Sequence, residues 1–173
     1  MKRNQTLRIA LAGVLIAVAV VGSTLSFPVL GSKCAPVQHM VNVICAVLLG
    51  PWYGVTVAFL ASLLRNLLGL GSLLAFPGSM CGALLSGLVY RRIKKVVPTA
   101  LAEVFGTGVV GGLLAYPIAV AFMGVSAANV AFYAYIVPFL ISTVAGSAIA
   151  TVLVFALKRS GALDSVAGQL ERG

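Results

Sequence analysis

The chain has 173 residues, 61% of them hydrophobic and only 9% charged, whereas a soluble domain carries about a quarter charged residues. Too few charges remain to cover a surface that faces water, so the composition excludes an ordinary soluble domain and predicts an integral membrane protein. The net charge of +9 comes from Lys and Arg in short clusters between apolar runs, which is typical of loops on the cytoplasmic side of a bilayer and argues against a nucleic-acid partner.

The first of six apolar segments covers about residues 8–26, long enough for a helix that crosses a membrane. A basic start precedes it, as in a cleaved signal peptide, but STLSF makes a poor cleavage site and further apolar segments follow. We therefore expect a retained helix. Gly13 and Ala17 lie four residues apart on it, a spacing that lets helices approach closely. Internal packing and docking of another membrane protein both remain open for this pair.

Polar groups gather in GSKCAPVQHMVNVICAVLLGP, residues 31–51, which holds the only histidine of the chain. Lys33 precedes a helix expected at about 38–49, which Gly50-Pro51 ends. Twelve residues rise only about 18 Å as a helix, which is less than a membrane-spanning helix needs. This element is therefore expected to be short or to be preceded by a re-entrant loop. Gln38 and Asn42 share one helix face, and His39 lies about 100° round it. Beside these neighbours, His39 favours a small-molecule pocket over a hydrogen-bonding role at the helix start.

The third and fourth helices are expected at about 52–70 and 76–91, joined by GLGSLLAFPGS, whose glycines and proline break a helix. Arg65 and Asn66 end the third helix, and Phe76 and Ser79 open the fourth. The connection has the glycines of a phosphate-binding loop but no lysine. It is therefore expected to be a turn, and ATP-driven work must come from a partner.

The fifth and sixth helices are expected at about 97–123 and 132–157, with Glu103 and Thr107 in the fifth. Arg65 and Glu103 are the two charges predicted within the membrane, and such residues usually face the protein interior. A salt bridge between them is feasible, as a packing clamp or as part of a ligand site. Residues 161–173 are expected to form a frayed cytoplasmic tail. Residues 1–173 as a whole are expected to form a single transmembrane domain.

Six spans with a cytoplasmic N-terminus place the RRIKK cluster at 91–95 and the C-terminus on the cytoplasmic side as well. Of the twelve Lys and Arg, only Lys33 and Arg65 fall elsewhere. The segment at 31–51 then lies outside, on the same side as Asn66 and Tyr133. The predicted fold class is an all-α integral membrane protein, a compact bundle of six transmembrane helices with both termini cytoplasmic and a long outer loop between helices 1 and 2.

Few side chains could act as a catalytic acid or base, since the chain has only three acidic residues and one histidine. A six-span serine protease with Ser79 as nucleophile and His39 as base is one alternative, although no serine-protease motif is present. A secondary carrier coupled to protons through Glu103 is another. The three cysteines show no CxxC spacing and have one histidine to join them, so we expect no disulfide, no metal site and no cofactor.

Four longer motifs point to a family: PxQHMxN at 36–42, LGPWY at 49–53, RNxxGxGxxLAFPGS at 65–79 and ExxGTG at 103–108. Together they resemble the ThiW-type S components of energy-coupling factor (ECF) vitamin transporters, over about residues 8–157. The resemblance implies a cell-membrane transporter subunit, not an enzyme, that captures the thiamine precursor hydroxyethylthiazole from outside. It also implies delivery by toppling while docked on a transmembrane T component that two cytoplasmic ATPases drive.

The same pocket could suit hydroxymethylpyrimidine or thiamine. Residues of these motifs and of the loop before the last span are the predicted substrate contacts: Lys33, Gln38, His39, Asn42, Arg65, Asn66, Phe76, Ser79, Glu103, Thr107 and Tyr133. Docking in the wider family commonly uses two alanines four apart in the first span. Here Ala10 is followed at that spacing by Val14, so the nearest docking pair is Gly13 and Ala17.

Overall fold

Long helices build almost the whole molecule in the computed structural model, which describes residues 2–29 and 32–171. A 3-10 turn, η1 (Ser23–Leu25), and two short antiparallel strands, β1 (Phe27–Val29) and β2 (Ser32–Cys34), follow the first helix. The helices are α1 (Lys2–Gly22), α2 (Pro36–Leu48), α3 (Pro51–Leu67), α4 (Ala75–Ile93), α5 (Val96–Val104), the π-helical η2 (Phe105–Gly111), α6 (Gly112–Phe122), α7 (Ile136–Arg159) and α8 (Ala162–Glu171).

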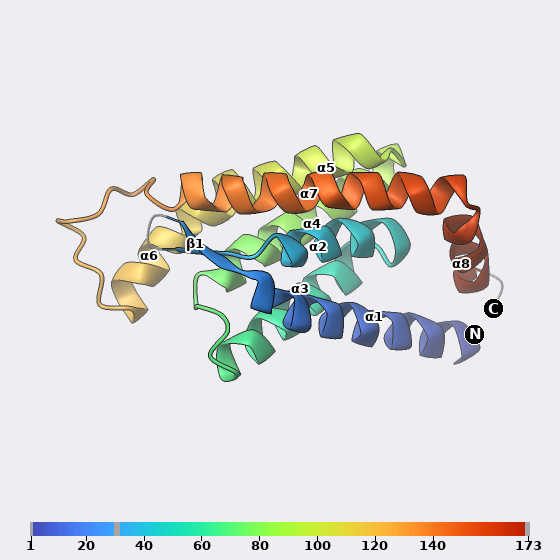
Figure 1. Cartoon of the computed structure of the whole chain (residues 1–173), viewed down its shortest axis with the longest axis horizontal. Helices are drawn as coiled ribbons and strands as arrows, with labels where there is room; N and C mark the ends of the chain where they lie inside the picture. The colour runs from blue at the N-terminus through green and yellow to red at the C-terminus, as the bar shows by residue number, and fades with distance from the viewer. Residues whose placement is uncertain (1, 30–31, 172–173) are drawn as a thin grey trace.

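The connections alternate between two ends of the molecule (Figure 1). The β1–β2 hairpin and the α3–α4 and α6–α7 loops lie at one end, which we call the hairpin end. The N-terminus, α8 and the α2–α3 and α4–α5 connections lie at the other, the termini end. Elements α5, η2 and α6 run on without a break as one long helical segment from residue 96 to residue 122.

Local sequence explains where the central helices begin and end. Pro36 opens α2 and Pro51 opens α3, each at a position where the missing N–H is not needed. Gly50 has a φ of +86°, which lets the chain turn from α2 into α3 within two residues. Lys94, at a φ of 55°, ends α4 in the left-handed conformation common at helix C-termini.

Glycines let α4 and η2 pack with their backbones in contact. A Cβ added at Gly111 would lie 2.5 Å from the Cα of Gly78, and one added at Gly106 would lie 2.9 Å from the Cα of Gly82. No side chain fits at such distances, so small residues at these positions allow the close approach. This packing brings the middle of the 96–122 segment against α4.

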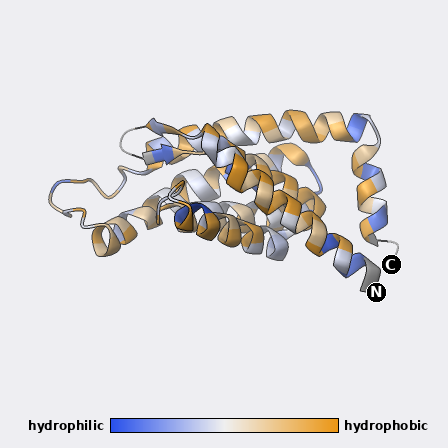
Figure 2. Cartoon of the chain, turned by 60° about the horizontal axis from the view of Figure 1, so that its bottom comes forward, coloured by the Kyte–Doolittle hydropathy of each residue, from blue (hydrophilic) through white to orange (hydrophobic). Residues whose placement is uncertain are grey.

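Three helices within the described residues are long and apolar enough to cross a membrane: Asn4–Leu25, Val96–Phe122 and Ile136–Arg159, while α2 is a shorter apolar helix. Figure 2 shows hydrophobic residues along the bodies of the long helices, with hydrophilic residues concentrated towards the two ends of the molecule. The chain is an all-α, multi-pass membrane protein, as its composition predicts.

Two segments differ from the sequence-based expectation. In place of a frayed tail from residue 161, residues 162–171 form α8, because its Leu163 and Leu170 are buried against the bundle. Asn4 also donates a side-chain hydrogen bond of 3.1 Å to the carbonyl of Leu170. The last long helix begins at Ile136 instead of at residue 132, so Tyr133 lies in a turn. Residues 172 and 173 lie outside the described residues.

Candidate functional site

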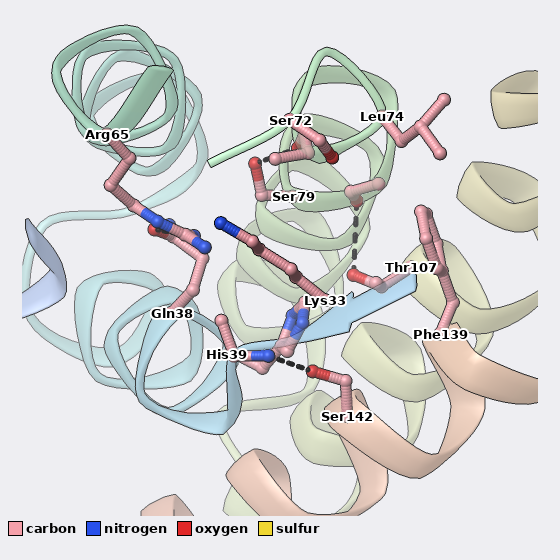
Figure 3. Close-up of a pocket in the computed structure, with 13 residues that line it drawn as sticks. Lys33, Gln38, His39, Arg65, Ser72, Leu74, Ser79, Thr107, Phe139 and Ser142 are labelled. Carbon is pink, nitrogen blue, oxygen red and sulfur yellow. Dashed lines mark hydrogen bonds between the residues drawn. The ribbon is translucent and has the colours of Figure 1, made fainter. Parts of the chain in front are cut away.

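A cavity lies beside the hairpin, at the hairpin end of the bundle (Figure 3). Its empty volume is about 490 Å3, part of which is open to solvent. Its walls come from β2, the start of α2, the end of α3, the α3–α4 loop, the start of α4, η2 and α7. The lining residues are Lys33, Ala35, Gln38, His39, Arg65, Ser72, Leu74, Ala75, Gly78, Ser79, Thr107, Phe139 and Ser142.

The hairpin is held over one wall of this cavity by two hydrogen bonds to α7. The backbone N–H of Ala35 donates to Ser142 Oγ at 2.9 Å, the bond drawn at Ser142 in Figure 3. The Cys34 thiol donates to the carbonyl of Pro138 at 3.2 Å, and its side chain is buried. Burial raises the pKa of the Cys34 thiol above its ordinary value. These contacts fix Lys33, the next residue back along β2, at the cavity mouth.

Below the cavity, one buried carboxylate oxygen accepts three hydrogen bonds, from donors on α2 and η2. Glu103 is fully buried, and its Oε1 accepts from His39 Nδ1 at 3.0 Å, from Asn42 Nδ2 at 3.0 Å and from Thr107 Oγ1 at 2.9 Å. We call these four residues the Glu103 network. Because an ionised carboxylate only accepts, His39 Nδ1 carries the hydrogen whether or not the ring is charged. The network therefore fixes the orientation of the imidazole ring.

The network continues into the cavity wall through amide and hydroxyl groups. Asn42 uses its second amide hydrogen on the carbonyl of Ser79 at 3.1 Å, and its Oδ1 accepts from Gln38 Nε2 at 3.2 Å. The hydroxyl of Thr107 is also 3.1 Å from the carbonyl of Gly78. Every polar atom of the Asn42 side chain is thus bonded within the protein, as expected of a structural support.

The second oxygen of Glu103 is different, because Oε2 is buried and has no hydrogen-bond partner among the described residues. A Cβ added at Gly82 would overlap both Glu103 Oε2 and Thr107 Oγ1. The carboxylate therefore occupies the space that Gly82 leaves free on α4. Only a glycine at this position lets the Glu103 network sit against α4.

The Arg65 to Glu103 salt bridge that the sequence made feasible does not form among the described residues. Glu103 Oε1 instead lies 3.0 Å from His39 Nδ1, a contact that is ionic only when the imidazole is protonated. Arg65 lies in the last turn of α3, is only 3% exposed, and reaches Gln38 Oε1 with Nη1 at 3.5 Å. Its Nε has no partner within residues 32–171. Arg65 therefore lines the cavity, while Glu103 supports the cavity from below.

Ser79 and His39 both line the cavity, but the hydroxyl of Ser79 is bonded to other groups and not to the ring of His39. The hydroxyl of Ser79 donates to the carbonyl of Ala75 at 2.7 Å and lies 3.0 Å from Ser62 Oγ. The Nδ1 of His39 is bonded to Glu103. A serine nucleophile needs its base at hydrogen-bonding distance, and the hydroxyl here is bonded to α3 and α4 instead.

The structure separates the predicted site residues into three groups. Six line the cavity: Lys33, Gln38, His39, Arg65, Ser79 and Thr107. Asn42 and Glu103 lie directly beneath it in the Glu103 network. Asn66, Phe76 and Tyr133 do not line it.

Each of these last three side chains has another role in the fold. Asn66 donates to the carbonyls of Ser62 at 2.8 Å and Ser72 at 3.1 Å, which ties α3 to the following loop. Phe76 packs against Phe59 with ring centroids 5.7 Å apart. Tyr133 is 57% exposed and contacts Phe132 edge to face.

Sequence reasoning missed the wall that α7 contributes, from Phe139 and Ser142. Both residues lie in a long apolar run, and no motif marks them. One signal was present, because Ser142, Thr143 and Ser147 are hydroxyl residues in that run and all three are buried. Hydroxyl groups on one part of an apolar helix indicate a side that faces other protein groups instead of lipid.

Gly13 and Ala17 of α1 face away from the bundle. Ala17 is exposed, and nothing lies within 4 Å of a Cβ added at Gly13. The exposed hydrophobic residues Val14, Val18 and Val21 belong to the same helix. Packing inside this chain therefore does not account for the Gly13 and Ala17 pair.

Comparison with known proteins gives one family. The model of the family described as "Thiamine-precursor transporter protein (ThiW)" matches residues 9–160, which is most of the chain. No curated protein and no solved structure matches the chain. The matched residues include every lining residue of the cavity.

Proposed function

The chain belongs to the ThiW family of thiamine-precursor transporters, and from that premise we propose that it is the substrate-capture S component of an ECF-type importer that binds hydroxyethylthiazole beside the hairpin. It is a transporter and not an enzyme. The observation that carries the proposal is the cavity at the hairpin end, where Arg65, His39 and Gln38 meet apolar walls from Leu74 and Phe139.

The chemistry of the cavity suits a small heteroaromatic alcohol. Hydroxyethylthiazole presents the apolar face and the nitrogen acceptor of its ring and the hydroxyl of its side chain, which need aromatic or aliphatic walls and a few donors. Phe139 and Leu74 supply the walls, and Lys33 and Arg65 supply donors. Ser142 adds a hydroxyl group whose oxygen accepts from Ala35 and whose hydrogen can be donated to a ligand. In this proposal Asn42 and Glu103 act as positioning residues beneath the site.

The charge of the lining favours a neutral precursor over thiamine. Lys33 and Arg65 line the cavity, and no Asp or Glu does so among the described residues. Thiamine carries a permanent positive charge on its thiazolium ring, so these two cations would repel it inside a partly desolvated site. Hydroxyethylthiazole and hydroxymethylpyrimidine are both free of this penalty.

Delivery of the ligand is proposed to need a transmembrane T component and two cytoplasmic ATPases. Six membrane crossings follow if α1, α2, α3, α4, the 96–122 segment and α7 each cross once, since their connections alternate between the two ends (Figure 1). The basic cluster that ends α4 and the one that ends α7 then lie inside, and the hairpin lies outside.

The outward face of α1 is the proposed docking surface for the T component. Replacing Ala17 by Leu should weaken association with the T component about tenfold or more, because a larger side chain keeps the two helix backbones apart. Ligand binding by the isolated subunit should not change. Co-purification of the two proteins tests this, with Ala148→Leu at an exposed position of α7 as the matched control. Equal co-purification of the wild type, Ala17→Leu and Ala148→Leu would contradict the docking assignment.

A calorimetric titration of the purified protein with hydroxyethylthiazole, hydroxymethylpyrimidine and thiamine tests the substrate. We expect hydroxyethylthiazole to bind, and thiamine to bind at least tenfold more weakly than hydroxyethylthiazole. No binding of hydroxyethylthiazole would overturn the substrate assignment. A clear preference for hydroxymethylpyrimidine would change the substrate but keep the capture function.

A proton-coupled carrier is the second candidate, and the buried His39–Glu103 pair favours it. Titratable residues inside membrane helices often form proton pathways. The two mechanisms differ in their partners, because a carrier works alone. Uptake of hydroxyethylthiazole by cells that lack every ECF ATPase would favour the carrier, whereas uptake only in their presence would favour the S component.

A further inference from the structure

The guanidinium of Arg65 is buried at the cavity with few bonds to the protein. The residue is 3% exposed and lines the cavity wall. Its one side-chain hydrogen bond within the described residues, from Nη1 to Gln38 Oε1, is long at 3.5 Å. Its Nε is buried and unpartnered within the described residues. An arginine has five N–H donors and stays protonated in proteins, so most of its capacity is unused here.

A second cation shares this cavity. Lys33 lines it from β2, and in Figure 3 its ammonium group points to the side of the cavity that holds Arg65. The ammonium has one long bond of 3.4 Å, to the carbonyl of Gly69. Two positive groups therefore face one space, and each is bonded only weakly to neutral acceptors.

No carboxylate of the described chain neutralises this pair at the cavity wall. The nearest acidic group of the site is Glu103, which lies beneath the lining and whose Oε1 is already shared by His39, Asn42 and Thr107. Even with the Glu103 charge counted against Lys33 and Arg65, one positive charge remains, and a charged His39 would add another. The residues around the cavity thus carry a net positive charge.

A buried charge without a partner is unfavourable, and in a native protein it usually has a counter-ion or a function. Since the protein supplies no counter-ion, a ligand can. Arg65 offers a planar fork of donors that matches the two oxygens of a carboxylate or phosphate, and Lys33 adds a point charge. The hydroxyl of Ser72 also lines the cavity and can donate to the same anion.

We propose that Lys33 and Arg65 form an anion subsite that binds a carboxylate or phosphate group carried by the thiazole ligand. This inference rests on the proposed function, because it adds a charged substituent to a ligand whose ring lies against Phe139 and Leu74. The preferred substrates are then acidic derivatives of hydroxyethylthiazole, such as its phosphate monoester or the corresponding thiazole acetic acid, in addition to the neutral alcohol.

Calorimetric titration of the full-length protein with three probes tests the subsite: hydroxyethylthiazole, its phosphate monoester, and methylthiazole acetic acid. We expect at least one acidic probe to bind ten times more tightly than the alcohol at low ionic strength. Arg65→Met should abolish that advantage while the alcohol still binds. Lys33→Met should reduce it severalfold, and because Lys33 is exposed, this variant keeps the test valid if Arg65→Met does not fold.

Arg92→Met is the matched control, since Arg92 is an exposed residue at the termini end and does not line the cavity. It should leave all three affinities unchanged. Inorganic phosphate alone should compete with the acidic probes only at much higher concentration, because it lacks the ring. Tighter binding of the alcohol than of both acids would overturn the subsite and leave the proposed function intact. No binding of any probe would overturn both.

Discussion

The two polar groupings at the hairpin end, the Glu103 network and the Lys33 and Arg65 pair, are built in opposite ways. In the Glu103 network three donors converge on Oε1 at 2.9 to 3.0 Å. The two cations have only long bonds, of 3.4 and 3.5 Å, to neutral acceptors. Both groupings contribute lining residues to the same cavity, from strand β2 and from helices around it.

This difference separates support from recognition. A polar group whose bonds are satisfied inside the protein stabilises the fold, and its removal leaves buried partners unpaired. A charged group with unused donors at a cavity has bonding capacity left for a ligand. Substitutions in the Glu103 network should therefore lower stability, whereas substitutions in the cation pair should lower affinity. Each prediction below tests one side of this contrast.

The largest effect on stability is expected from Glu103→Leu. It removes the acceptor shared by three buried donors, each of which costs about 1–3 kcal/mol when left unpaired, so the loss should reach several kcal/mol. Thermal unfolding in detergent measures it. Glu103→Gln is the control, because its amide oxygen can still accept and should restore part of the stability. Equal stability of the wild type and Glu103→Leu would contradict a supporting role.

Gly82→Ala should have the next largest effect. The added Cβ would overlap Thr107 Oγ1 and Glu103 Oε2, so α4 and η2 must separate or the carboxylate must move. Overpacking of this kind costs about 1–3 kcal/mol. The matched control is Gly168→Ala in α8, where nothing lies within 4 Å of the added atom. If both variants unfold at the wild-type temperature, the packing of α4 on the network is not as tight as described.

Thr107→Val should cost about 1 kcal/mol, since it removes one hydroxyl donor and keeps the size of the side chain. The remaining donors of Glu103, from His39 and Asn42, stay in place. Thermal unfolding again measures the change. Ser86→Ala in α4 serves as a comparison, because its hydroxyl bonds only to the carbonyl of Ala83 in its own helix. A loss for Thr107→Val as large as that for Glu103→Leu would mean that this hydroxyl alone holds the network.

Arg65→Met should change the stability of the empty protein least, by about 1 kcal/mol or less in either direction. Replacing a buried charge by an apolar side chain of similar length is often neutral or stabilising, and Arg65 has little bonding to lose. The same unfolding experiment compares it with Glu103→Leu. A destabilisation of several kcal/mol would place Arg65 among the supporting residues and remove the contrast.

The sequence was a good guide to the helices whose ends carry Pro or Gly. The expected helix at 52–70 is α3 at 51–67, and the expected one at 76–91 is α4 at 75–93. The start of α7 was placed too early because AFYAY continues the apolar run. Pro138, in the first turn of α7, is the local signal of the true start. The amphipathic α8 was missed because its few buried leucines are hidden among polar residues.

The candidate site was only partly predictable, because some of its contacts are between segments distant in sequence. The cluster of Gln38, His39 and Asn42 was recognisable on one short helix. The partner of His39 was not recognisable, because Arg65 was the one partner considered for Glu103, as the other charge predicted within the membrane. Asn66 was taken as a ligand contact, but it bonds carbonyls of its own loop, a use of asparagine that local sequence does not distinguish from recognition.

The most direct test of the account is a titration of Ala75→Phe with hydroxyethylthiazole. Ala75 lines the cavity at the start of α4, makes no side-chain hydrogen bond, and would place a large ring in the ligand space. The control is Ala128→Phe, in the exposed loop before α7. We expect Ala75→Phe to lose at least a hundredfold in affinity while its thermal unfolding stays close to that of the control. Wild-type affinity in a folded Ala75→Phe would contradict the placement of the ligand in this cavity.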